Sequence, residues 1–215
     1  MPMIAVFTGL GVAYVIGSLP TGYWLTKAIK GLDIRRHGSG NTGATNVGRV
    51  LGKPWGITVL IVDIFKGTLA VLLGKAVFYS PVSHVSADLY KILCAVAAVS
   101  GHNWSVFLGF QGGKGVATSA GALLGATPLP LVLSVVVWGA VAKLSGYVCL
   151  GSIGSALAYS VLICFFKSST EMRIFGWMLA VMMIVKHRSN IQRLRLGTEP
   201  KIGQAKTQQA GHALQ

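Results

Sequence analysis

Long runs of apolar residues, separated by short polar segments, follow one another along the chain. A helix needs about 20 mostly apolar residues to cross roughly 30 Å of bilayer hydrocarbon, although buried spans can be shorter. One run, Val116–Val141, is long enough for a single span but contains Thr-Pro-Leu-Pro at positions 127–130. The other runs predict spans at Met3–Leu25, Ile57–Tyr79, Leu89–Phe110, Tyr147–Phe166 and Ile174–Val185. The first span is interrupted at Gly17, Ser18 and Pro20, and we interpret it as retained rather than as a cleaved signal peptide.

The basic residues decide whether the split run crosses the membrane once or twice. The segment Lys27–Lys53 and the chain from Lys186 onward each carry six Lys or Arg residues. Cytoplasmic segments of membrane proteins are enriched in these residues, so both are expected on the cytoplasmic side. The chain between them must then cross an even number of times, which makes Val116–Val141 two short spans. We therefore predict an all-α, polytopic transmembrane helix bundle of about seven spans, with the N-terminus outside and the C-terminus inside.

Composition supports this interpretation. The 215 residues are 53% hydrophobic and only 11% charged, whereas a soluble domain carries about 25% charged residues. The formal net charge of +14 is explained by cytoplasmic loops and anionic lipid headgroups, so we expect membrane lipids and no nucleic acid as partners. The three cysteines lie apart in apolar stretches and form neither a metal-binding pattern nor a disulfide framework. No metal site and no cofactor are expected.

Two of the polar segments on the predicted cytoplasmic face have residues suited to anion binding. In the first, Asp33–Arg49, closely spaced Gly, Ser, Thr and Asn let backbone N–H groups converge on an anion, and Arg35, Arg36 and Arg49 add guanidinium groups. The alternative is a flexible loop of turn-forming residues. In the second, the sequence Gly-Gly-Lys-Gly at 112–115 stands before a helix, where free N–H groups favour a phosphate. It lacks the spacing of a P-loop, and its alternative is a helix break with a snorkelling lysine.

A third segment follows the last predicted span. His187 and Asn190 are three residues apart and share a face if the helix continues, with Arg193 on a neighbouring part of that face. An anchor touching lipid phosphates explains most arginines here, but neither histidine nor asparagine is needed for anchoring. Deeper in the chain, Asp63 and Lys66 are predicted to form a self-neutralising pair that braces the bundle. His102 is expected to be a hydrogen-bonded structural histidine.

Together these segments resemble the PlsY family of bacterial membrane glycerol-3-phosphate acyltransferases. The resemblance runs from Gly17 to Glu199 through five ordered motifs: GSLPTGY, GSGNTGATNVGR, DIFKG, GHNWSVFLGFQGGKGVATSAG and HRSNIQRLRLGTE. It implies transfer of a fatty acyl group from acyl-phosphate to the 1-hydroxyl of sn-glycerol 3-phosphate. The products would be lysophosphatidic acid and inorganic phosphate, in the first committed step of phospholipid synthesis. It also implies a bacterial cell membrane location, an active site facing the cytoplasm, and the upstream acyl-phosphate-producing enzyme as a partner.

The resemblance also implies residue roles. The catalytic positions are Ser39, Arg49, His187 and Asn190. The substrate- and phosphate-binding positions are Asn41, Thr45, Asn46, Gly112, Gly113, Lys114, Gly115 and Ser152. Glu199 is expected to be structural. Residues 1–200 are expected to form a single acyltransferase domain, and residues 201–215 a polar, disordered tail.

Two functions of other classes compete with an acyltransferase. A small anion or phosphate-ester transporter could use the same cationic segments as its binding site. Against it, the polar residues gather on one face, and Asp63 with Lys66 is the only charged pair deep in a predicted span. A lipid-binding structural protein would explain the basic tail but not the Gly/Ser/Asn/Arg segment.

Overall fold

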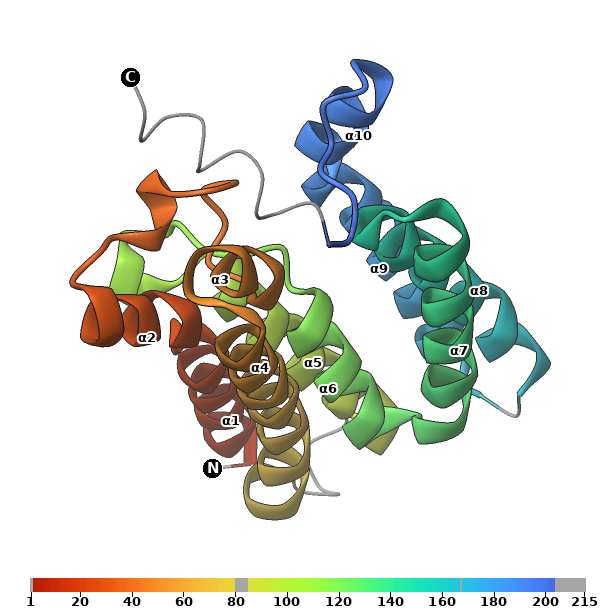
Figure 1. Ribbon diagram of the computed structural model, residues 1–215. Helices are drawn as coiled ribbons and strands as arrows, with labels where there is room; N and C mark the ends of the chain where they lie inside the picture. The colour runs from red at the N-terminus through yellow and green to blue at the C-terminus, as the bar shows by residue number, and fades with distance from the viewer. Residues whose placement is uncertain (1, 80–84, 167, 204–215) are drawn as a thin grey trace, which may run out of the picture.

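The computed structural model describes residues 2–79, 85–166 and 168–203, and contains helices and no strand within them (Figure 1). Seven apolar helices in this part of the chain form the bundle: α1 (Pro2–Ser18), α4 (Lys53–Leu73), α5 (Ala87–Asn103), α6 (Val116–Ala126), α7 (Pro128–Ser145), α8 (Val148–Phe165) and α9 (Thr170–Lys186). Shorter helical segments are α2 (Thr21–Lys30), η1 (Ile34–Arg36), α3 (Ala44–Leu51), the π-helical turn η2 (Gly74–Phe78), η4 (Val106–Leu108) and α10 (Arg188–Arg195).

The outer surface of the bundle is apolar, as a lipid-facing surface requires. Phe65 and Val136, for example, are 62% and 66% exposed. Five helical stretches are long and apolar enough to cross a membrane: Met3–Lys30, Lys53–Phe78, Ala87–Leu108, Pro128–Ser145 and Val148–Phe165. The helices α6 and α9 are shorter, at 11 and 17 residues. The predicted all-α membrane bundle is confirmed, with α1, α4 and α5 to α9 in the places of the predicted spans.

The split run forms two helices, as the charge distribution predicts. Thr127 separates α6 from α7, and Pro128 and Pro130 lie in the first turn of α7, where a missing N–H breaks no helical hydrogen bond. Figure 1 shows α6 running away from the end that carries α3, and α7 returning toward it. The Thr127 hydroxyl lies 2.7 Å from the Tyr159 hydroxyl of α8, so the exposed end of α6 is held against a neighbouring helix.

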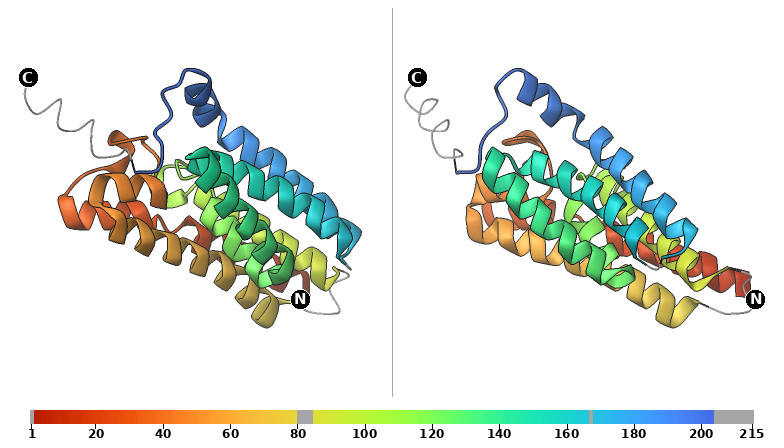
Figure 2. Two further views of the ribbon diagram at one scale, coloured as in Figure 1. Left: turned by 45° about the vertical axis from the view of Figure 1, so that its right-hand side comes forward. Right: turned by 90° about the vertical axis from the view of Figure 1, so that its right-hand side faces the viewer.

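The first predicted span is interrupted where Gly17, Ser18 and Pro20 stand. The helix α1 ends at Ser18, and α2 begins at Thr21 and lies across the end of the bundle (Figure 1). The helix α2, the α3 region, the turn between α7 and α8, and α10 gather at the end opposite the first turns of α1 (Figure 2). The polar segments therefore share one end of the molecule, as predicted. Most of the segment between the predicted spans Ile57–Tyr79 and Leu89–Phe110, and most of the predicted tail at 201–215, lies outside the described residues.

Glycines let pairs of helices approach to backbone contact. A Cβ on Gly67 of α4 would collide with the carbonyl oxygen of Thr118 in α6, and one on Gly121 of α6 would collide with that of Ile64 in α4. The same relation joins α1 to α5, because a Cβ on Gly17 would collide with the carbonyl of Ala98. Lipid drives helix association weakly, so close packing of this kind contributes much of the stability. It joins α1, α4, α5 and α6 into one tight group.

We expect Gly121→Ala to destabilise the protein and Gly139→Ala to leave it intact or more stable. The first substitution overpacks the contact between α6 and α4 and should lower the free energy of unfolding by about 1–3 kcal/mol. Gly139 in α7 has no atom within 4 Å of its ideal Cβ position, so alanine there should gain up to about 1 kcal/mol of helix propensity. Thermal unfolding in detergent measures both. Equal midpoints for the two variants would contradict the close packing of α4 and α6.

Candidate active site

A cavity of about 300 Å³ lies where the polar end of the bundle meets its apolar interior. Its lining comes from the α3 region, α4, α5, α6, α7, α8, α9 and α10, which brings together segments that are distant in sequence. Of the positions singled out in the sequence, it includes Ser39, Asn41, Thr45, Asn46, Arg49, Lys114, Gly115, Ser152, His187, Asn190 and Glu199. Its apolar wall includes Leu60, Leu123, Leu131, Trp138, Tyr159 and Leu179.

The segment before α3 folds around the side chain of Asn46. Its amide nitrogen donates to the carbonyl oxygens of His37 and Asn41, both at 2.9 Å, and its Oδ1 accepts from the Ser39 N–H at 2.8 Å. Gly38 has a positive φ of 60°, and a Cβ there would collide with Oδ1 of Asn46. Although Asn46 lines the cavity, its side chain is therefore engaged within the loop. The loop in turn presents Ser39 and Asn41 at the cavity, and the first turn of α3 adds Thr45.

Arg49 supplies the positive charge of this segment. It lies in the last turn of α3 and makes no hydrogen bond or ion pair with residues 2–79, 85–166 or 168–203. Burial lowers the pKa of Arg49, but a guanidinium of this basicity stays charged. Arg35 does not line the cavity. Its guanidinium forms an ion pair with Asp33 at 2.7 Å, and this contact lowers the pKa of the Asp33 carboxyl to about 2. Of these two arginines, only Arg49 faces the cavity.

The Gly-Gly-Lys-Gly sequence divides between two roles. Lys114 and Gly115 line the cavity, and Gly115 has a positive φ of 77° immediately before α6. Gly112 and Gly113 do not line this cavity. The Gly113 N–H instead donates to the His102 carbonyl at 3.0 Å, and a Cβ on Gly113 would collide with Nε2 of the same histidine. These two glycines allow the loop to pass close against α5.

Residues in and after α10 hold the side chain of Lys114 through hydrogen bonds. Its Nζ donates to Oδ1 of Asn190, whose Nδ2 donates to Oε1 of Glu199 at 2.7 Å. The other carboxylate oxygen of Glu199 accepts from Nε of Arg193, also at 2.7 Å. Burial, together with the positive charges of Arg193 and Arg49, lowers the pKa of Lys114 to about 8, although the negative charge of Glu199 acts in the opposite direction. Glu199 is thus neutralised by Arg193, whereas Lys114 has no carboxylate of its own.

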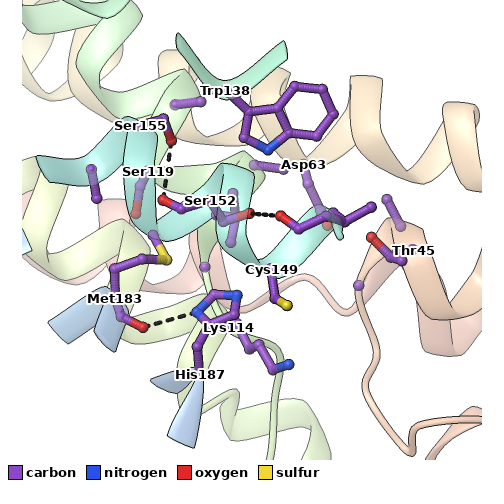
Figure 3. A pocket seen from close by; sticks show the side chains of 18 of the residues that line it. Thr45, Asp63, Lys114, Ser119, Trp138, Cys149, Ser152, Ser155, Met183 and His187 are labelled. Carbon is purple, nitrogen blue, oxygen red and sulfur yellow. Dashed lines mark hydrogen bonds between the residues drawn. The ribbon is translucent and has the colours of Figure 1, made fainter. Parts of the chain in front are cut away.

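His187 lies at the junction of α9 and α10, and one of its ring nitrogens makes a hydrogen bond within the protein. Its Nδ1 lies 2.8 Å from the Met183 carbonyl, which can only accept, so Nδ1 carries the hydrogen. Burial lowers the pKa of His187 to about 4, so the ring is neutral at physiological pH. The Nε2 atom therefore has a free lone pair. Figure 3 shows His187 beside Lys114, with Thr45 on the opposite side of the view.

Other lining residues were not singled out by the sequence. Ser119 lies one helical turn after Gly115, and its hydroxyl is buried without a hydrogen-bond partner. Ser152, which the sequence did single out, also lines the cavity, and its hydroxyl donates to the Val148 carbonyl at 3.0 Å, within α8. Only helical spacing from Gly115 could have indicated Ser119, since serine is common in membrane helices. Within the described ranges, no three His, Cys, Asp or Glu side chains cluster in a way that could hold a metal ion.

Comparison with known proteins gives this cavity a chemical context. The model of the family described as glycerol-3-phosphate acyltransferase matches residues 7–197. The chain belongs to this family. Relatives of that name in Desulforudis audaxviator and Moorella thermoacetica are 45% and 47% identical over 94% and 91% of this chain, and over 98% and 96% of their own lengths.

Solved structures agree with the family assignment. The chain resembles a crystal structure of PlsY (YgiH), an integral membrane glycerol 3-phosphate acyltransferase, in its glycerol 3-phosphate form. The TM-score is 0.83 at 33% identity, covering 92% of this chain and 96% of that one. The lysophosphatidic acid form gives 0.80 at 32% identity, covering 93% and 96% of the two chains. This family member is accordingly a membrane acyltransferase, and a transporter is not supported.

The affinity of this acyltransferase for glycerol 3-phosphate should fall as the pH rises through about 8. Lys114 loses its positive charge over that range, because its pKa lies below the usual lysine value. His187 stays neutral well above its pKa of about 4 and should add no inflection near neutrality. The KM for glycerol 3-phosphate, measured between about pH 6 and pH 10, tests this. In Lys114→Arg the inflection should disappear, and an unchanged inflection in that variant would assign it to another group.

Proposed function

We propose that this protein transfers a fatty acyl group from acyl-phosphate to the 1-hydroxyl of sn-glycerol 3-phosphate, releasing lysophosphatidic acid and inorganic phosphate. The observation that carries the proposal is a cavity with two cations, Arg49 and Lys114, that form no ion pair with a carboxylate in the described part of the chain. Its two carboxylates, Asp63 and Glu199, are neutralised by Lys66 and Arg193. A cavity with uncompensated positive charge suits two anionic substrates.

The two phosphates would occupy opposite sides of the polar end. The glycerol 3-phosphate phosphate would be held by Lys114, the Gly115 N–H and Ser152. The phosphate of the acyl donor would be held by Arg49 and the hydroxyl of Ser39, with Asn41 and Thr45 beside them. Arg49 can bind two phosphate oxygens at once, which would also stabilise the charge that develops as phosphate leaves.

The reaction then needs little activation from the protein. The oxygen of the glycerol 1-hydroxyl attacks the acyl carbon and forms the new C–O bond. The bond from that carbon to the phosphate oxygen breaks, and its electron pair leaves with phosphate. The lone pair on Nε2 of His187 would accept a hydrogen bond from the attacking hydroxyl and orient it. As the C–O bond forms, the hydroxyl proton leaves this hydrogen bond and passes to the departing phosphate. Because the glycerol oxygen attacks the acyl carbon directly, no covalent acyl-enzyme forms.

Other site residues would hold these groups in place. Glu199 fixes the Asn190 amide so that its Oδ1 faces Lys114, a structural role. Asn46 would shape the Ser39 loop instead of touching substrate, because its hydrogen bonds are made within that loop. Gly112 and Gly113 would act likewise, by allowing close contact with α5.

We also propose the cellular setting that the charge distribution predicts. The polar end would face the cytoplasm of a bacterial cell membrane, with the N-terminus outside and the C-terminus inside. Residues 1–200 would work as one acyltransferase domain, because the cavity takes residues from Ser39 through Glu199. The polar tail after residue 200 begins with an ordered contact, in which the Ile202 N–H donates to the Gly146 carbonyl at 2.8 Å. An upstream enzyme that makes acyl-phosphate would supply the donor.

The donor is tested with purified protein in detergent, glycerol 3-phosphate, and either palmitoyl-phosphate or palmitoyl-CoA. Phosphate release and lysophosphatidic acid are expected with palmitoyl-phosphate alone. The double variant His187→Ala/Asn190→Ala should lose at least about 10²-fold in kcat/KM, since orientation of the hydroxyl and of Lys114 is lost together. Turnover of palmitoyl-CoA at an equal rate would refute the donor assignment. Near wild-type activity in the double variant would refute the residue roles.

The acyl chain would occupy the apolar part of the cavity, so narrowing it should favour shorter chains. Ser134 of α7 is buried and lines the cavity, and leucine there would fill part of the space. We expect Ser134→Leu to lower the kcat/KM for palmitoyl-phosphate relative to octanoyl-phosphate by about tenfold or more. Val136→Leu on the same helix is the control, because Val136 is exposed and does not line the cavity. Equal ratios in both variants would place the acyl chain elsewhere.

A further inference from the structure

A buried ionic cluster lies directly behind the Gly-Gly-Lys-Gly loop. The Nζ of Lys66 lies 2.8 Å from Oδ1 of Asp63 and 3.0 Å from Nδ1 of His102, and donates to the Leu19 carbonyl at 2.8 Å. Asp63, Lys66 and His102 are only 2%, 3% and 8% exposed. The ammonium group thereby forms an ion pair within α4 and hydrogen bonds to α5 and to the break between α1 and α2.

The contact with Lys66 fixes the tautomer of His102. An ammonium group can only donate, so Nδ1 of His102 accepts and the ring hydrogen sits on Nε2. That Nε2 faces Gly113, where a Cβ would collide with it, and the His102 carbonyl accepts the Gly113 N–H at 3.0 Å. Both the ring and the backbone of His102 therefore hold the residue immediately before Lys114.

Lys66 itself does not line the substrate cavity, whereas Asp63 and His102 do. We propose that Lys66 is a positioning residue for glycerol 3-phosphate, which sets the place of Lys114 by holding His102 against Gly113. The proposal rests on the proposed function, in which Lys114 binds the phosphate of glycerol 3-phosphate. Neutralisation of Asp63 alone would need only the ion pair between these two residues of α4. The contacts to His102 and to the Leu19 carbonyl extend the same charge to the loop and to the α1–α2 break.

The test is Lys66→Met, which removes the ammonium group and keeps an unbranched side chain. A displacement of about 1 Å at a binding group can cost ~10²-fold. We expect the KM for glycerol 3-phosphate to rise about tenfold or more, with kcat at saturating substrate changed much less. Lys75→Met is the matched control, because Lys75 is exposed near the opposite end of the same span and should leave both constants unchanged.

A second variant separates positioning from simple neutralisation of Asp63. In Asp63→Asn/Lys66→Met no unpaired carboxylate is left in the bundle, so thermal stability in detergent should recover toward that of the wild type. The hydrogen bond from Lys66 to His102 is still missing in this variant, so the KM for glycerol 3-phosphate should stay raised. A KM that returns to the wild-type value in the double variant, or never rises in either, would overturn the proposal.

Gly113→Ala alters the same loop while Asp63, Lys66 and His102 stay unsubstituted. The new Cβ would push against the His102 ring. The substitution should raise the KM as Lys66→Met does, and an unchanged KM would overturn the proposed path. Calorimetric titration of glycerol 3-phosphate into each protein gives a readout independent of turnover. If the wild type binds glycerol 3-phosphate but forms no lysophosphatidic acid, the proposed reaction fails while the binding data still decide the role of Lys66.

Discussion

A charge inside a helix bundle surrounded by lipid needs a partner in the protein or in its ligand, because hydrocarbon cannot solvate it. The arrangement of the polar end of this molecule follows from that constraint. Asp63 is neutralised by Lys66, and Glu199 by Arg193. Lys114 is held by the neutral amide of Asn190, and Arg49 has no partner in the described part of the chain. The remaining positive charge therefore lies at the cavity, where a phosphorylated substrate can neutralise it.

The same constraint explains why the site lies at helix breaks. Irregular backbone is tolerated near a membrane only where it is buried in protein or lines a polar cavity. Leu19 lies in the break between α1 and α2, Gly115 at the start of α6, and His187 at the junction of α9 and α10. Two of these breaks free a backbone group that a continuous helix would have used: the Leu19 carbonyl binds Lys66, and the Gly115 N–H is available to an anion. Away from these breaks, close glycine contacts join α4 to α6 and α1 to α5.

Much of this architecture could be predicted from local sequence. Apolar runs indicated the spans, and the positions of Lys and Arg separated Val116–Val141 into two helices. Motif residues such as Ser39, Lys114 and His187 were found because their types and order are specific. Their grouping around one cavity is also what a shared face of the membrane predicts.

The remaining features depend on contacts between distant segments, which no local pattern records. Gly112 and Gly113 look like phosphate-binding residues in sequence, yet the collision that explains Gly113 is with His102, on the preceding helix. Asn46 looks like a ligand, and its hydrogen bonds show a residue that shapes its own loop. A polar residue that lines the cavity can therefore make its side-chain hydrogen bonds within its own loop. In a bundle with few charges, each buried hydrogen bond also fixes the position of the next group, as Glu199 does for Asn190 and Asn190 for Lys114. The position of Lys114 at the cavity is thus set by a series of hydrogen bonds that starts at Glu199.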